Sequence, residues 1–131
     1  RCFDRLVVDL GQRVAGLPGP DSNGYQVQYV PLITHDGSGQ PQSLAGGAFL
    51  SIVVHAPAHD GDYNPTYAPA DPAHAVDVAG FRTFRQMAFF GTFEGQTTLG
   101  LGVRARLPFR VFVLSGPAEG SRVVIDVAHY W

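Results

Sequence analysis

Two similar hexapeptides lie near opposite ends of the sequence: RLVVDL (residues 5–10) and RVVIDV (residues 122–127). Each consists of an arginine, three aliphatic residues, an aspartate and a further aliphatic residue. Successive side chains of a β-strand point to opposite faces, so every second residue belongs to one face. The apolar alternates are Leu6, Val8 and Leu10 in the first, and Val123, Ile125 and Val127 in the second. The pattern predicts two strands of one sandwich that face a common core.

The charged residues of these hexapeptides indicate how the two strands pair. Residues i and i+4 of a strand lie roughly 13 Å apart, so neither arginine reaches the aspartate of its own hexapeptide. Antiparallel pairing sets Arg5 opposite Asp126 and Arg122 opposite Asp9, whereas parallel pairing sets like charges together. We therefore predict an antiparallel pair with these four residues as structural charge pairs. Contact with a ligand is the alternative role for the two acids.

The rest of the chain also has the short periodicity of strands. Five further candidates are YQVQYV (25–30), FLSIVVH (49–55), MAFFGTF (87–93), TTLGLGVRA (97–105) and FRVFVL (109–114). Clusters rich in glycine, proline and polar residues separate them, as turns do. These clusters are LPGPDSNG (17–24), HDGSGQP (35–41), FEGQ (93–96) and SGPAEGS (115–121). About seven short strands predict an all-β fold, a β-sandwich of two small and mainly antiparallel sheets.

One long irregular stretch interrupts the strands. Residues 55–75 are rich in proline, which predicts a long surface loop. Asp71 and Pro72 have the pattern of an N-cap followed by a first helical residue, and Gly80 that of a C-terminal stop. We expect at most one short helix, near residues 72–79.

Composition bounds the class of protein. A chain of 131 residues suits a single domain over residues 1–131, and a formal net charge of −2 argues against nucleic acid as a partner. No apolar run is long enough to span a membrane. Cys2 is the single cysteine, so it pairs outside these residues or stays a free thiol. The chain begins abruptly before a strand, and we expect an upstream export signal or anchor.

The longer apolar stretches resemble a known family. They are CFDRLVVDL (2–10), LAGGAFLSIVV (44–54), GTFEGQTTLGLGVRARLPFRVFVL (91–114) and SRVVIDVAH (121–129). Together with Pro117 ahead of RVVID (122–126), they are similar to the AMIN-like domain of secreted and lipid-anchored actinobacterial proteins. The resemblance implies a sandwich of two small sheets outside the cytoplasm. Related AMIN domains target cell-wall amidases and secretion pores by binding peptidoglycan, whereas the AMIN-like branch has no defined activity.

An arginine run is the first place to look for a binding patch. Arg104, Arg106 and Arg110 fall within seven residues, and guanidinium groups hold carboxylates or phosphates through paired hydrogen bonds. A solvated strand end is the alternative interpretation. Arg82 and Arg85 form a second, weaker pair.

Gly100 and Gly102 share one face of a predicted strand. Glycines inside a strand often mark the close approach of another backbone or of a ligand. Either a loop or sheet packs against them, or the flat strip admits a sugar ring beside an aromatic neighbour such as Phe93. The terminal residues 129–131, HYW, cover one end of the sandwich or present Trp131 as an exposed platform, and we expect the former.

Metal-ion and catalytic patterns are weak. His55, His59, Asp60 and Asp62 are close together, but Pro65 stands where a calcium loop of this spacing requires glycine. No serine lies in a nucleophile-elbow context, and Cys2 lacks a recognisable histidine partner motif. We expect no metal, no cofactor and no enzymatic activity.

Two functions remain after these exclusions. The first is a non-enzymatic extracytoplasmic module, secreted or lipid-anchored, that binds peptidoglycan or another wall polymer, with Arg104, Arg106, Arg110, Gly100, Gly102 and Phe93 as candidate ligand residues. The second is a module for protein–protein interaction or self-association, through an exposed sheet edge or apolar patch, without a glycan ligand.

Overall fold

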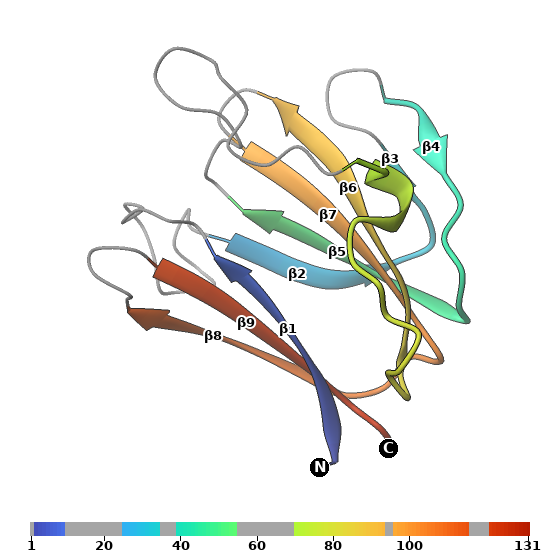
Figure 1. Ribbon diagram of the computed structural model, residues 1–131, viewed down its shortest axis with the longest axis vertical. Helices are drawn as coiled ribbons and strands as arrows, with labels where there is room; N and C mark the ends of the chain where they lie inside the picture. The colour runs from blue at the N-terminus through green and yellow to red at the C-terminus, as the bar shows by residue number, and fades with distance from the viewer. Residues whose placement is uncertain (1, 10–24, 35–38, 55–69, 94–95, 116–120) are drawn as a thin grey trace.

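The computed structural model describes residues 2–9, 25–34, 39–54, 70–93, 96–115 and 121–131. Within them the chain forms two antiparallel sheets that pack into a sandwich, with a small third sheet beside them (Figure 1). The three-stranded sheet has the order β1 (Phe3–Asp9), β9 (Ser121–Ala128), β8 (Phe109–Ser115). The four-stranded sheet has the order β2 (Tyr25–Val30), β5 (Ala48–Val54), β7 (Gln96–Val103), β6 (Phe84–Phe93). The third pairs β3 (Ile33–Thr34) with β4 (Pro41–Gln42). The predicted all-β sandwich is confirmed.

The two hexapeptides pair as their charges predict. β1 runs antiparallel to β9, with Arg5 opposite Asp126 and Asp9 opposite Arg122. The side chain of Asp9 lies outside what the structure describes. Leu6 is buried and Val8 packs against the core, while Leu10 falls outside the described residues. The hexapeptides are therefore neighbouring strands of one sheet that join the two ends of the chain.

The core lies between the two large sheets and is built from alternate residues of their strands. Each strand turns one side-chain face inward, so a period of two in the sequence becomes one apolar layer. The fully buried members are Leu50 and Ile52 of β5, Leu101 and Val103 of β7, and Val123, Ile125 and Val127 of β9. The predicted core residues of β9 are all among them.

A second, smaller apolar cluster covers the outer face of the four-stranded sheet. Ile33 and Leu44 pack there against Ala88 and Phe90 of β6. Ile33 is the first residue of β3, and Leu44 follows β4 by two residues. Because these strands have two residues each, periodicity did not predict them.

The helix is shorter than expected. A 3-10 turn, η1 (Pro72–His74), begins as predicted, with the Asp71 carboxylate accepting from the Ala73 amide at 3.2 Å and Pro72 in the first turn. It ends at His74 rather than near Gly80 because the amide of the C-cap residue Ala75 donates to the Met87 carbonyl of β6 at 2.8 Å. Of the predicted loop 55–75, residues 55–69 fall outside the described residues. No described helix is long and apolar enough to cross a membrane.

Candidate ligand-binding site

One end of the sandwich gathers two arginine pairs that are far apart in the sequence. β7 ends at Val103, and the chain bends at residues 104–106 before β8 begins in the other sheet. The Arg104 amide donates to the Thr83 carbonyl at 2.8 Å, which sets this bend beside the segment leading into β6. Figure 1 shows the bend, the start of β6 and the C-terminus at the same end. We call the exposed residues Arg82, Arg85, Arg104 and Arg106 the arginine end.

The guanidinium groups of the arginine end have open hydrogen-bonding capacity. Arg104 Nη2 donates to the His129 carbonyl at 2.5 Å, and Arg85 Nη1 donates to the Arg82 and Phe84 carbonyls at 2.8 and 3.3 Å. Within the described part of the chain, none of the four arginines lies within ion-pair distance of a carboxylate. Each guanidinium has five N–H donors in a planar fork, so donors remain for an external anion.

Aromatic side chains border the bend at residues 104–106. The Arg106 guanidinium lies over the Tyr29 ring at 5.5 Å from its centroid, and the Tyr29 hydroxyl donates to the Leu107 carbonyl at 2.6 Å. Trp131 Nε1 donates to the Arg106 carbonyl at 3.0 Å, yet the residue is 79% exposed. The expectation that Trp131 covers the end of the sandwich is therefore wrong: one hydrogen bond holds the indole while its faces stay open.

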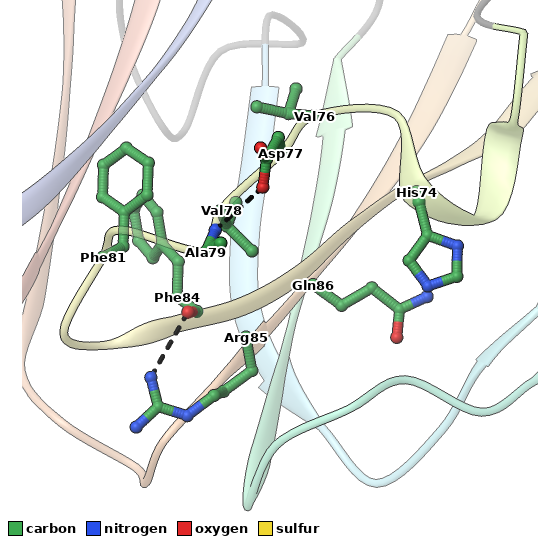
Figure 2. Close-up of a pocket in the computed structure, with 9 residues that line it drawn as sticks. All are labelled: His74, Val76, Asp77, Val78, Ala79, Phe81, Phe84, Arg85 and Gln86. Atoms are coloured by element: carbon green, nitrogen blue, oxygen red, sulfur yellow. Dashed lines mark hydrogen bonds between the residues drawn. The ribbon is translucent and has the colours of Figure 1, made fainter.

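A groove of about 620 Å³ extends from the arginine end along the start of β6 (Figure 2). It is lined by His74, Val76, Asp77, Val78, Ala79, Phe81, Phe84, Arg85 and Gln86. The Gln86 side chain fixes one part of it, donating to the Ala73 carbonyl at 2.5 Å and accepting from the Ala45 amide at 2.7 Å. Figure 2 shows Arg85 and His74 well apart, with the apolar Phe81, Phe84 and Val78 side chains on the Arg85 side. The groove thus combines an apolar wall with a cationic end.

Arg110 lies away from the arginine end. Its Nε donates to Asp126 at 2.8 Å on the outer face of the three-stranded sheet, where Arg5 holds the same carboxylate through Nε at 2.7 Å and Nη2 at 3.0 Å. Phe3 and Phe112 lie 5.0–5.6 Å from the two guanidinium groups. The predicted run of three arginines is therefore divided, because the bend before Pro108 separates Arg110 from the other two.

Gly100 and Gly102 offer no surface to a sugar. Both are buried under the small outer cluster. A Cβ on Gly100 would lie 2.5 Å from Phe90, and one on Gly102 would lie 1.9 Å from the Ala45 carbonyl oxygen. Loop and side-chain packing thus occupies the strip that was the candidate for a glycan ring. The Phe93 side chain lies outside what the structure describes.

The buried pair of Asp4 and His129 ties the two sheets together near this end. His129 Nε2 donates to Asp4 Oδ1 at 2.8 Å, and Asp4 Oδ2 accepts from the amides of Thr83 and Phe84 at 2.5 and 3.2 Å. Asp4 and His129 are 7% and 6% exposed. This pair was not predicted, although Asp4 shares the inward face of β1 with Leu6 and Val8, where a charge is exceptional.

Two buried carboxylates have lowered pKa values. Burial raises the pKa of Asp4, but hydrogen bonds from His129, Thr83 and Phe84 outweigh it and bring the pKa below its ordinary value of 3.8. Burial likewise raises the pKa of Asp126, and hydrogen bonds from Arg5 and Arg110 reverse the effect. Both carboxylates are therefore held in their charged form.

These pKa shifts predict acid sensitivity. As the pH falls past 3.8, the unfolded chain takes up protons at Asp4 and Asp126 that the folded chain still excludes, so the free energy of unfolding decreases. The stabilisation is present above the ordinary pKa and is lost as the pH drops through the folded one. We expect Asp126→Asn to be less stable than wild type at neutral pH but to lose less on acidification. Urea unfolding at several pH values measures this, and equal losses in both proteins would contradict it.

The four candidate metal ligands belong to the long loop predicted at residues 55–75. His55, His59, Asp60 and Asp62 fall outside the described residues. In the ranges that the structure does describe, no group of three or more His, Cys, Asp or Glu side chains could hold a metal ion. Cys2 is exposed and free among these residues.

Comparison with protein families gives one match. The model of the AMIN-like domain matches residues 1–129, which is nearly the whole chain. Neither curated proteins nor solved structures gave a match. AMIN-like domains are modules of the cell envelope and are generally extracytoplasmic.

Proposed function

The chain belongs to the AMIN-like domain family, and from this premise we propose that it is a non-enzymatic module, secreted or lipid-anchored, that binds peptidoglycan. One observation carries the proposal: the arginine end presents four exposed guanidinium groups without carboxylate partners among the described residues, beside an exposed indole. Such a surface suits a polymer that carries both anions and sugar rings.

The chemistry of the two ligand components fits different parts of this surface. Peptide carboxylates of the wall accept paired hydrogen bonds from Arg104 and Arg106, whose planar forks match a carboxylate. A sugar ring presents C–H groups that pack on an aromatic face, and the exposed indole of Trp131 offers one. The apolar wall of the groove beside Arg85 accommodates the alkyl side chains of a short peptide. Binding therefore divides into an electrostatic and an apolar part.

The test is co-sedimentation with purified sacculi. We expect the double variant Arg104→Gln with Arg106→Gln to lower the affinity at least about tenfold, since hydrogen bonds to charged groups contribute most to such contacts. Trp131→Ala is expected to weaken retention less. Raising the salt concentration should reduce wild-type binding and leave the double variant almost unchanged.

A matched control separates the site from general charge. Gln26→Glu lowers the net charge of the protein by one unit, as each Arg→Gln change does. The side chain of Gln26 is exposed on β2 and is not part of the arginine end. It should bind sacculi as wild type does. Retention that falls equally in Gln26→Glu and in a single Arg106→Gln variant would reject a specific site, and no retention of wild type would reject the function. Release of soluble muropeptides by the purified protein would reject the non-enzymatic assignment.

A further inference from the structure

The groove beside the start of β6 lies between two segments of the chain. The segment that follows η1 is tied to β6 by the bridge between Val76 and Met87, and it turns back where the Phe81 amide donates to the Val78 carbonyl at 3.0 Å. Residues 84–86 of β6 form the other side. The volume of about 620 Å³ is in the range of sites that hold small ligands.

Two large apolar side chains in this groove are exposed to water. Val76 is 39% exposed and Phe81 is 38% exposed, and both line the groove. The Phe81 ring lies 5.1 Å from the ring of Phe84, which is buried and supports it from behind. A ligand with alkyl groups would remove this apolar surface from water, which is favourable.

The guanidinium of Arg85 is held in position with one edge left open. Its Nη1 donates to the Arg82 and Phe84 carbonyls at 2.8 and 3.3 Å, whereas Nε and Nη2 have no partner among the described residues. Arg5 shows what this edge does in the same protein: its Nε and Nη2 donate to the two carboxylate oxygens of Asp126 at 2.7 and 3.0 Å. Arg85 therefore offers a fixed fork that suits a carboxylate.

The charges along the groove give a bound anion one orientation. Asp77 also lines the groove and is exposed, with Oδ1 accepting from the Ala79 amide at 3.0 Å. Figure 2 shows Asp77 and Arg85 apart, with Val78 between them in this view. Asp77 repels an anion and Arg85 attracts it, so a ligand with a single carboxylate binds with that group at Arg85. Its alkyl part then lies toward Val78 and Phe81.

We infer that this groove binds the free C-terminal carboxylate of a short peptide of the wall polymer. The inference rests on the proposed function and makes it more specific, because a cross-linked peptide has no free terminal carboxylate. The groove therefore favours peptides that are not cross-linked. Arg104 and Arg106 do not line the groove, so they remain available for other anions of the same polymer.

The probe is an acetylated alanine tripeptide, used with a free C-terminal carboxylate and as its C-terminal amide. We expect the carboxylate form to bind with a Kd at least about tenfold lower, because hydrogen bonds to charged groups are the strongest of their kind. Arg85→Gln should abolish this preference. Phe81→Ala should weaken both forms alike, since it removes apolar contact only. Titrations followed by amide chemical shifts in NMR spectra measure each Kd.

Arg82→Gln is the matched control. It changes the net charge as Arg85→Gln does, at an exposed arginine three residues away whose side chain does not line the groove. This variant should keep the wild-type preference for the carboxylate form. Equal losses in Arg82→Gln and Arg85→Gln would show an effect of general charge and overturn the inference. So would a wild-type protein that binds the carboxylate and the amide equally or binds neither.

The double variant Arg104→Gln with Arg106→Gln separates this inference from the proposed function. It should lose retention on sacculi and still prefer the carboxylate form of the tripeptide. Wild-type protein that sediments with sacculi but does not prefer the carboxylate would overturn the groove assignment and leave the proposed function intact. A preference for the carboxylate without retention on sacculi would refute the wall as the source of the peptide, and with it the proposed function.

Discussion

Asp4→Ala is expected to lower the free energy of unfolding by about 3–5 kcal/mol, because it leaves buried partners of a charge without their acceptor. The carboxylate accepts hydrogen bonds from His129 Nε2 and from the amides of Thr83 and Phe84, all buried. Alanine provides no acceptor. The three donors then line a small buried cavity without hydrogen-bond partners, which costs stability. Urea unfolding followed by circular dichroism measures the loss.

Two further variants make this result specific. Asp4→Asn retains one oxygen for the backbone amides, so its loss should fall between wild type and Asp4→Ala. Asp77→Ala removes an exposed carboxylate whose contact is a local hydrogen bond with the Ala79 amide at 3.0 Å. It should cost less than about 1 kcal/mol. If Asp4→Ala cost no more than Asp77→Ala, the buried pair would not be what holds the two sheets at this end.

Gly102→Ala is expected to destabilise the protein by about 2–4 kcal/mol through overpacking. The added Cβ would lie 1.9 Å from the Ala45 carbonyl oxygen, which is a backbone atom that no side-chain rotation can move. The segment around Ala45 is held on both sides, by the bond between the Ala45 amide and Gln86 at 2.7 Å and by that between the Gly47 amide and the Val103 carbonyl at 2.8 Å. A shift that relieves the clash must weaken one of these bonds.

Gly80→Ala controls for the general effect of replacing glycine. A Cβ there would meet nothing within 4 Å, so the change should alter the free energy of unfolding by no more than about 1 kcal/mol and can be stabilising. Equal unfolding midpoints for Gly102→Ala and wild type would show that the loop over β7 moves freely. In that case Gly102 could still be uncovered for a ligand.

The two glycines illustrate where sequence reasoning had to stop. Their place on one face of a strand was evident from alternation, and close backbone packing was one of two interpretations. Only the fold shows that the segment around Leu44 and Ala45 returns to lie over β7 and fills this face. Covering segments of this kind are short and lack periodicity, so no local sequence pattern predicts them.

The candidate site shows the same division. The sequence shows two arginine pairs, Arg82 with Arg85 and Arg104 with Arg106. That the two pairs lie at the same end of the sandwich depends on the hydrogen bond between the Arg104 amide and the Thr83 carbonyl. Arg110 follows Arg106 closely in sequence and yet lies with Arg5 and Asp126 on a sheet face. Neighbours in the chain are separated wherever it crosses from one sheet to the other.

The sequence by itself determined the class of fold, the positions of the seven longer strands and the antiparallel register of β1 and β9. Alternation is a property of each strand alone, and the opposite charges of these two strands match in one antiparallel register. The tertiary structure alone decided which charges are buried, which glycines are covered and which arginines meet. Asp4 and His129 lie at the ends of neighbouring strands of one sheet, and their burial follows from the packing of this sheet against Thr83 and Phe84 at the start of β6 in the other. Long-range closure brings such residues together through contacts between faces, and a period of two does not record which faces meet.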